Sequence, residues 1–581
     1  MDLSPANWPA RARAEQQEFS STGWVPAAAQ NFHSKDGIIS ATVSPISVEA
    51  GLQALRQGGS AADAAITVAL TQICTQLGSV VSYAGIISAL YYDSRTGKIS
   101  SLDGGWNSYH GETDPMTIPP CDLSLLTDGA MPSAPKDPGR QTLVPGFMAS
   151  AEALHARFGR LDFSSLFAPA LWYADHGVQV TPVLAWYFNN RKEVFARTPE
   201  GRNFLHQAGN SLPQYRDVFL QPELAKTLRN VAKNGAREMY SGGWAKAFVT
   251  TIQQAGGKAT LADLAGYHPI WSEPATTSFC GHDIYAAGPP NHAAYQILTA
   301  LNMTSAMQLN KRGPYWQDPA MFRDLTWILL ATCTAPALLP QTQALLRKEE
   351  IGFSPQDQLS PEFATALAAA LPDLFAVAPE TQPHHSNAIV VVDKDGNIAA
   401  LTHTINTVIW GDTGLVVGGI PIPDAAGFQQ RGLAQTKPGS RLPNSIIDMI
   451  ILNANRQPVL ATAGIGSALF PKTLRTIVSL YGQHLDLATI AAAPPLLLNL
   501  SPQPHPQSLA DIPANIPDGA YADDFIEKLQ SLGIHGTKLA GPIVTGQRGT
   551  LAMVAIDANA GEKRRSKYRA LWYGPARRSS F

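Results

Sequence analysis

The stretch that decides the fold runs from Ser386 to Thr407 and reads Ser-Asn-Ala-Ile-Val-Val-Val-Asp-Lys-Asp-Gly-Asn-Ile-Ala-Ala-Leu-Thr-His-Thr-Ile-Asn-Thr. Two apolar runs flank an Asp-Gly turn, a pattern typical of a β-hairpin. Ser386 stands at the head of the first strand, and Thr404 and Asn406 close the second. This arrangement makes Ser386 a candidate nucleophile; the alternative is an ordinary hairpin with a serine at its edge.

The hairpin resembles the cleavage site of the γ-glutamyltransferase (γ-glutamyltranspeptidase) family, which reads Thr-Thr-His-x-Ser-Val-Val-Asp-x-Asp-Gly-Asn. Its members are N-terminal nucleophile hydrolases, in which the chain cuts itself before Ser, Thr or Cys. The freed α-amine then acts as the base for that residue's own side chain. The resemblance implies that Ser386 is the nucleophile, that Thr404 supports it and that Asn406 contacts substrate.

Other segments match the family in the same order along the chain. They are 39–65, 143–147, 158–161, 221–228, 239–243, 263–268 and 281–290. The first of them also predicts two consecutive helices. Gly58-Gly59 suits a left-handed helix end, and Ser60 with Asp63 forms a capping-box pattern for the next helix.

The resemblance covers about residues 37 to 575 and implies an α+β protein, a four-layer αββα sandwich of the N-terminal nucleophile hydrolase type. We expect a polar N-terminal lead (1–36), a large-subunit region (37–385) and a small-subunit region (386–581). The two fragments of self-cleavage would interleave in one core and form a heterodimer.

A glycine-containing segment, Thr462 to Ser467, resembles the Gly-Ser-Pro-Gly-Gly segment of the family. The resemblance implies that the backbone N–H groups of Gly466 and Ser467 form an oxyanion hole, an arrangement that stabilises the tetrahedral intermediate of acyl transfer. The alternative is that these glycines only form a tight turn.

The segments that recognise substrate depart from the family. The family has an Arg after Leu-Asp-Gly to hold the substrate α-carboxylate, whereas Gly105 and Trp106 follow here. Asn444-Ser445 replaces the paired serines, and Asp424 lies in a shortened form of the segment that holds the α-ammonium. Neither Gly nor Trp can supply the bidentate geometry of an Arg–carboxylate pair. We therefore expect a neutral or larger acyl group, accepted partly by Trp106.

These features predict a γ-glutamyltransferase-like, self-processing amidohydrolase or acyltransferase that cleaves an amide or peptide through an acyl-enzyme on an N-terminal Ser. The candidate catalytic residues are Ser386, Thr404, Gly466 and Ser467. The candidate substrate-binding residues are Asn406, Asn444, Ser445, Trp106 and Asp424. Two alternatives stay open: an acylase of the same fold that acts on a non-glutamyl amide, and an unprocessed relative without activity.

Composition points away from several other classes. A net charge of -2 with 15% charged residues gives no case for binding nucleic acid or an anionic membrane. The four cysteines lie far apart, and no metal-binding or cofactor-binding motif is present, so we expect no metal and no cofactor. Met1 to Gln30 lacks the apolar run of a secretory signal, which leads us to expect a cytoplasmic enzyme.

Two further segments carry local predictions. The uncharged stretch from Ala64 to Tyr92 is too polar for a membrane span and predicts a buried helix followed by a core strand at 85–92. The Pro-rich stretch from Ser501 to Pro517 predicts a surface loop.

Overall fold

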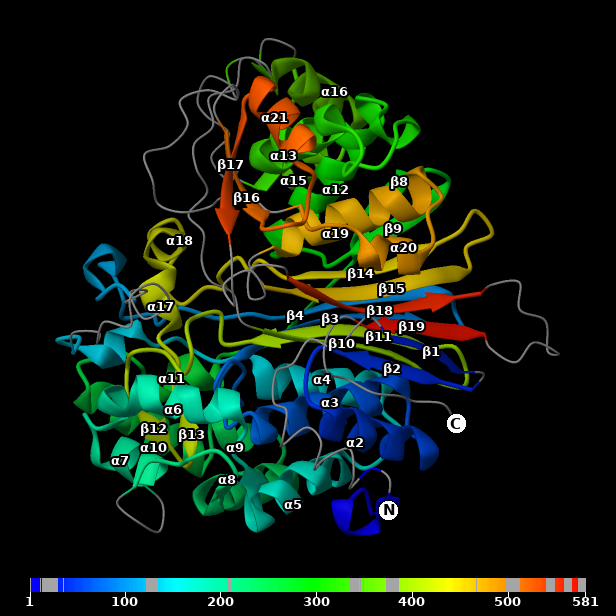
Figure 1. Cartoon of the computed structure of the whole chain (residues 1–581). Helices are drawn as coiled ribbons and strands as arrows, with labels where there is room; N and C mark the ends of the chain where they lie inside the picture. The colour runs from blue at the N-terminus through cyan, green and yellow to red at the C-terminus, as the bar shows by residue number, and fades with distance from the viewer. Residues whose placement is uncertain are drawn as a thin grey trace.

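The hairpin of the opening stretch is present, and it lies at the centre of the molecule (Figure 1). The structure is a computed structural model. It describes residues 2–10, 12, 30–34, 36–121, 134–206, 211–333, 344, 346–347, 350–371, 386–466, 468–496, 512–539, 549–557 and 567–572. The hairpin strands are β10 (Ser386–Val392) and β11 (Ile398–Thr404), joined by a turn in which Gly396 has a φ of 83°.

The hairpin belongs to a six-stranded antiparallel sheet with the order β2-β10-β11-β3-β4-β7. The remaining strands are β2 (Ile38–Ala41), β3 (Ile86–Asp93), β4 (Lys98–Gly104) and β7 (Ile270–Ser272). β3 confirms the core strand expected after residue 85. The hairpin is therefore flanked on both sides by segments from the first half of the chain.

A seven-stranded antiparallel sheet has the order β1-β19-β18-β15-β14-β9-β8. Its strands are β1 (Gln30–Ser34), β8 (Ala275–Phe279), β9 (His282–Ala286), β14 (Ile447–Leu452), β15 (Pro458–Ile465), β18 (Thr550–Ile556) and β19 (Tyr568–Trp572). The described residues also contain three short two-stranded sheets. They are β5 (Val178–Gln179) with β6 (Val218–Phe219), β12 (Val416–Val417) with β13 (Ile420–Pro421), and β16 (Ile512–Pro517) with β17 (Ile534–Leu539).

The two large sheets face each other (Figure 1). Ala388 and Val390 of the hairpin share one buried apolar cluster with Ile450 and Ala463 of the seven-stranded sheet. The neighbouring residues Ile389 and Val391 belong to a different cluster, with the helices on the outer face. Because side chains alternate along a strand, the hairpin is apolar on both faces and buried on both.

Helices cover the outer face of the six-stranded sheet (Figure 1). They are α2 (Pro45–Arg56), α3 (Ala61–Thr75), α4 (Phe147–Phe158), α5 (Ala168–His176), α6 (Pro182–Phe195), α7 (Pro199–His206), α8 (Pro222–Asn234), α9 (Arg237–Tyr240), α10 (Gly243–Gln254) and α11 (Leu261–Ala265). α3 confirms the buried helix expected at the start of the stretch from Ala64 to Tyr92.

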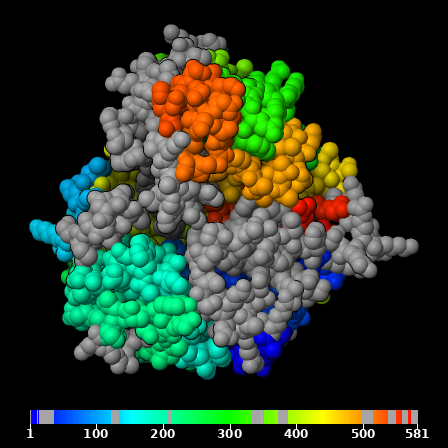
Figure 2. All heavy atoms as spheres, viewed as in Figure 1, coloured from blue at the N-terminus to red at the C-terminus, as the bar shows by residue number. Residues whose placement is uncertain are grey.

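A second group of helices packs on the outer face of the seven-stranded sheet. These are α12 (His292–Ala306), α13 (Pro319–Cys333), α15 (Pro355–Gln358), α16 (Pro361–Ala370), α19 (Leu469–Ile477), α20 (Leu487–Ala492) and α21 (Asp523–Ser531). Figure 2 shows the two helical groups at opposite ends of the molecule, green and orange above and cyan-green below. The structure thus confirms the α+β class.

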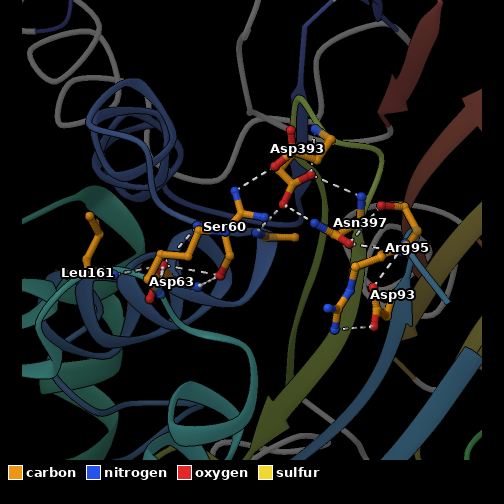
Figure 3. A network of polar contacts seen from close by, with 11 residues as sticks. Ser60, Asp63, Asp93, Arg95, Leu161, Asp393 and Asn397 are labelled. Carbon is orange, nitrogen blue, oxygen red and sulfur yellow. Dashed lines mark hydrogen bonds and ion pairs between the residues drawn. The ribbon is translucent and has the colours of Figure 1, made fainter.

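A network of polar contacts holds the turn of the hairpin against α3 (Figure 3). The Asp393 carboxylate accepts hydrogen bonds from the backbone N–H of Asn397 at 3.0 Å and from that of Ala61 at 3.1 Å. Ser60 and Asp63 form the capping box expected from the sequence, and the Asp63 carboxylate accepts the Ser60 N–H at 2.8 Å. The start of α3 therefore fixes the far end of the hairpin, opposite the end that carries Ser386.

Two segments differ from what the sequence predicts. The surface loop predicted up to Pro517 is wrong for residues 512–517, which form β16 parallel to β17 with Ala514 and Ile516 buried. The earlier part of that loop lies outside the described residues. Within the polar lead, β1 forms an edge strand, and Leu3 and Trp8 are buried in the core. Among the described residues no helix is both long and apolar enough to cross a bilayer.

Candidate active site

Ser386 and Thr404 are partners in the register of β10 and β11. Ala388 and Val390 lie in the layer between the two sheets, so alternation turns Ser386 toward the same layer. Thr404, two residues from Thr402, shares that face. Ser386 is half-buried and Thr404 is buried. The structure therefore brings the two hydroxyl residues together at one end of the sheet.

Asn406 follows directly and turns the chain away from the strand. Its backbone N–H donates a hydrogen bond to the Thr404 Oγ1 at 2.8 Å. Its φ of 54° lies in the left-handed region, which asparagine tolerates better than most residues. This turn holds the Thr404 hydroxyl in place, and the contact of Asn406 with substrate stays a prediction.

Gly466 follows β15 on the facing sheet and begins the turn into α19. Its φ is 92°, and a Cβ at this position would lie 3.0 Å from the Cα of Gly549. Its carbonyl accepts a hydrogen bond from the Leu469 N–H at 3.0 Å. Both the backbone conformation and the close approach of Gly549 require glycine here. Ser467, the second predicted donor of the oxyanion hole, lies outside the described residues.

Contacts across the sheets bring the two halves of the site together. Thr402 Oγ1 donates to Asp448 Oδ1 at 2.6 Å, which links β11 to β14. Ile447 pairs with Gly464, so Ser445 before β14 and Gly466 after β15 lie at the same end of that antiparallel pair. The site thus forms where the Ser386 end of one sheet meets the Gly466 end of the other.

The recognition region is built around an ion pair between Arg441 and Asp103. The Arg441 Nε donates to Asn107 Oδ1 and its Nη2 donates to the His268 carbonyl, both at 2.7 Å. The guanidinium also lies 4.8 Å from the ring centre of Tyr267. Burial raises the pKa of Asp103, and the guanidinium opposes that rise. The charge of Arg441 is therefore already matched within the protein.

Asn444 and Ser445 connect this ion pair to α12. Asn444 Nδ2 donates to Asp103 Oδ1, and Ser445 Oγ lies 2.9 Å from His292 Nε2. A cavity of about 210 Å³ opens beside His292. Its lining comprises Pro289, Pro290, Asn291, His292, Tyr295, Gln296, Thr299, Ala331, Thr332, Pro355, Gln358, Phe363 and Leu367. Among the described residues, then, no Asp, Glu, Lys or Arg lines this cavity.

Trp106 and Asp424 are both buried in the protein interior. Trp106 is 2% exposed and packs in an apolar cluster with Ala425. Asp424 is fully buried; its Oδ1 accepts from the Thr407 hydroxyl and its Oδ2 from the Asp412 N–H at 2.9 Å. Both side chains are held by contacts within the protein, and their contact with substrate stays a prediction.

Sequence reasoning missed two buried titratable residues near the nucleophile. His403 Nε2 lies 2.8 Å from Gln72 Oε1, and burial lowers the pKa of this imidazole to about 3, so it stays neutral. Burial also raises the pKa of Asp448 to about 7. The sequence does single out Asp448, because it is the one charged residue in the otherwise apolar run from Ile446 to Leu452. Among the described residues no group of three or more His, Cys, Asp or Glu is placed to hold a metal.

Comparison with known proteins decides the family. A family profile described as Gamma-glutamyltranspeptidase matches residues 47–565, most of the chain. The chain belongs to the gamma-glutamyltranspeptidase family. This confirms the resemblance drawn from the hairpin and the expectation of an enzyme of this family.

Several curated relatives of the chain are named proenzymes. The glutathione hydrolase proenzyme of Pseudomonas aeruginosa is 26% identical over 499 residues, which cover 79% of this chain and 82% of the relative. The capsule biosynthesis protein CapD proenzyme of Bacillus anthracis is 24% identical over 445 residues, covering 75% and 74%. Among solved structures, cephalosporin acylase from Bacillus halodurans has a TM-score of 0.72 at 20% identity and covers 96% of this chain and 98% of its own. This last likeness shows a shared fold.

Proposed function

We propose that this member of the gamma-glutamyltranspeptidase family is a self-processing amidohydrolase or acyltransferase with Ser386 as its N-terminal nucleophile. The observation that carries the proposal is the register of Ser386 opposite Thr404, at the sheet end next to Gly466. The two facing sheets and their outer helices support a four-layer αββα arrangement of the N-terminal nucleophile hydrolase type. The proenzyme names of the relatives support self-cleavage.

In maturation, the Ser386 Oγ attacks the carbonyl carbon of His385. The bond between that carbon and the Ser386 nitrogen breaks, and the nitrogen takes up the hydroxyl proton. Water then hydrolyses the ester, which leaves a carboxylate on His385 and a free α-amine on Ser386. The fragments 1–385 and 386–581 stay together as a heterodimer, because β10 and β11 are enclosed between β2 and β3 of the first fragment.

In turnover, the α-amine of Ser386 is the general base. A free α-amine has a reference pKa of about 7.7 to 8.0, so part of it is neutral near pH 7. It accepts the Oγ proton as Oγ attacks the amide carbonyl, and backbone N–H groups at Gly466 and Ser467 stabilise the oxyanion. The α-ammonium then protonates the leaving amine, and the acyl group remains as an ester on Ser386. Water or a second amine cleaves that ester.

The substrate that fits best is an amide whose acyl part is uncharged. No Arg follows Gly104, and the charge of Arg441 is matched by Asp103. The cavity beside His292 has no Asp, Glu, Lys or Arg in its lining among the described residues. A free α-carboxylate in this cavity would therefore be desolvated without a Lys or Arg of the described lining to receive it.

The experiment that tests this function compares wild-type protein with Ser386→Ala on a panel of acyl anilides. Wild-type protein is expected to release aniline and, after rapid denaturation during turnover, to carry the acyl mass on the fragment that begins at Ser386. Ser386→Ala is expected to show neither. Equal turnover by both proteins, or acyl mass on a residue other than Ser386, would overturn the assignment of the nucleophile.

A further inference from the structure

Asp448 is a buried carboxyl group that the steps above leave without a role. It lies on β14, and it is fully buried. Ile450 and Leu452, which share its face of the strand, pack in the layer between the sheets, so the carboxyl group points toward the six-stranded sheet. Its Oδ1 accepts the Thr402 hydroxyl at 2.6 Å, and its Oδ2 has no hydrogen-bond partner among the described residues.

This carboxyl group lies one step along the sheet from the nucleophile pair. Thr402 pairs with Ala388 in the same register in which Thr404 pairs with Ser386. Residues two apart on an antiparallel strand are separated by about 7 Å and point to the same face. The hydrogen bond between Thr402 and Asp448 therefore joins the two sheets at a point two residues from Thr404 on β11.

We propose that Asp448 is a positioning residue of the reaction, which acts through Thr402 to hold Thr404 opposite Ser386. The proposal rests on the proposed function, because it takes Ser386 as the nucleophile. A hydroxyl donating to a carboxylate forms a short, charge-assisted bond. A strand fixed at Thr402 cannot slide relative to the facing sheet, so Thr404 keeps its register and its distance from Ser386.

The strength of this anchor depends on whether Asp448 is ionised. Burial raises the pKa of Asp448 to about 7, and hydrogen bonding to Thr402 and a weaker interaction with Ser88 oppose the rise. Above that pKa the carboxylate is the stronger acceptor for Thr402; below it the neutral acid is a weaker one. Positioning is therefore expected to tighten as the pH rises through 7.

Other ionisable groups belong to the surfaces that face Asp448. They are the α-amine of Ser386 after cleavage, Asp103 with Arg441, Tyr92 on β3, and Tyr285 and Asp283 on β9. The pKa of Asp448 is set by burial and by hydrogen bonding rather than by these charges. The α-amine titrates in the same range, so a variant of Asp448 is needed to separate the two ionisations.

The test measures kcat and KM from pH 5.5 to 9 for wild type, Asp448→Asn, Thr402→Val and the double variant. Loss of a charge-assisted hydrogen bond typically costs 10- to 150-fold. We therefore expect kcat to fall at least tenfold above pH 8, with KM changed less than about twofold. The deficit of Asp448→Asn should shrink toward pH 6, because the wild-type acid is then also neutral. The double variant should be no slower than the slower single variant, since both remove the same bond.

A matched control is Thr326→Val, a buried threonine on α13 whose hydroxyl donates to the Phe322 carbonyl of its own helix. It should leave kcat and its pH profile unchanged. A pH-independent loss in Asp448→Asn, a change in KM alone, or additive losses in the double variant would overturn the positioning role. If Asp448→Asn does not fold, Thr402→Val tests the same role. It should lower kcat and leave KM nearly unchanged, and a change in KM alone would overturn the proposal.

The outcome for Ser386→Ala separates the two proposals. If this variant keeps wild-type turnover, the proposed function fails whatever Asp448 does. If it is inactive while Asp448→Asn shows the wild-type kcat profile, the function stands and only the role of Asp448 is overturned.

Discussion

Ser386 and Thr404 face each other across two antiparallel strands, at the end of the hairpin opposite its turn. The N–H of Asn406 holds the Thr404 hydroxyl at 2.8 Å. The opposite end of the hairpin is fixed to α3 through Asp393. The hairpin is thus anchored at both ends, which is what a nucleophile at a strand terminus requires to keep one geometry.

Removing the Thr404 hydroxyl tests this relationship. Thr404→Ala is expected to slow both self-cleavage and turnover, because the Asn406 N–H loses its acceptor beside Ser386. The effect on unfolding should be about 1 kcal/mol, as for one lost hydrogen bond. Fragment formation on a denaturing gel, aniline release and a thermal melt measure the three effects. Unchanged turnover with a sharply lower Tm would instead make Thr404 a core residue.

The hairpin and the first two helices could be predicted from sequence because their signals are local. The Asp395-Gly396 turn and the Ser60 and Asp63 capping box each lie within a few residues. The recognition region could not be predicted in the same way. Arg441 and Asp103 are 338 residues apart, and only the fold brings them together. Likewise, Asp448 and its partner Thr402 are 46 residues apart and lie on different sheets, so only the packing of the sheets brings them together.

The ion pair between Arg441 and Asp103 predicts the specificity. Wild-type protein should turn over γ-glutamyl anilide about 10- to 150-fold less well than an anilide with an uncharged acyl part, because Asp103 already matches the charge of Arg441. Asp103→Asn removes the matching charge and should shift the ratio toward the γ-glutamyl compound. Steady-state kcat/KM for both anilides decides the point. A wild-type preference for γ-glutamyl anilide would contradict the prediction that Arg441, paired with Asp103, does not bind the substrate α-carboxylate.

Inserting an arginine where the family has one is expected to be a poor substitute. A Cβ at Gly105 would lie 3.2 Å from Arg441 Cδ and 3.3 Å from Asn444 Nδ2. Gly105→Arg should therefore displace these residues, lower the Tm and reduce turnover of both anilides. A gain in γ-glutamyl turnover without a loss of Tm would contradict this packing argument.

A substitution of Asp424 distinguishes a structural role in the loop after Asn406 from binding of a substrate ammonium group. Its carboxylate accepts from Thr407 and from the Asp412 N–H, so Asp424→Ala should loosen the loop after Asn406. Leaving such buried donors unpaired costs about 1 to 3 kcal/mol. Turnover should fall equally for acyl parts with and without an ammonium group. A loss confined to substrates with an ammonium group would instead identify Asp424 as its ligand.

Asp448 predicts how stability changes with pH. Its folded pKa of about 7 lies above the ordinary aspartate value of 3.8, so the folded state keeps a proton that the unfolded state releases. This group therefore costs stability increasingly as the pH rises from about 4 to 7, by at most about 4 kcal/mol, and the cost is constant above that range. The free energy of unfolding is measured with denaturant for Ser386→Ala and for Ser386→Ala combined with Asp448→Asn. The Ser386→Ala background keeps the protein as one uncleaved chain. The gain from Asp448→Asn should grow across that window, and a pH-independent difference would contradict a buried, titrating carboxyl group.

The central claim is that Ser386 becomes an N-terminal nucleophile, and intact mass spectrometry of the purified protein tests it most directly. Wild-type protein of 581 residues should appear as two fragments, residues 1–385 and 386–581, the second with Ser386 at its amino terminus. Ser386→Ala should remain one folded chain, because alanine has no Oγ for the acyl shift. A wild-type chain that is intact yet active, or a fragment that begins at another residue, would contradict the account.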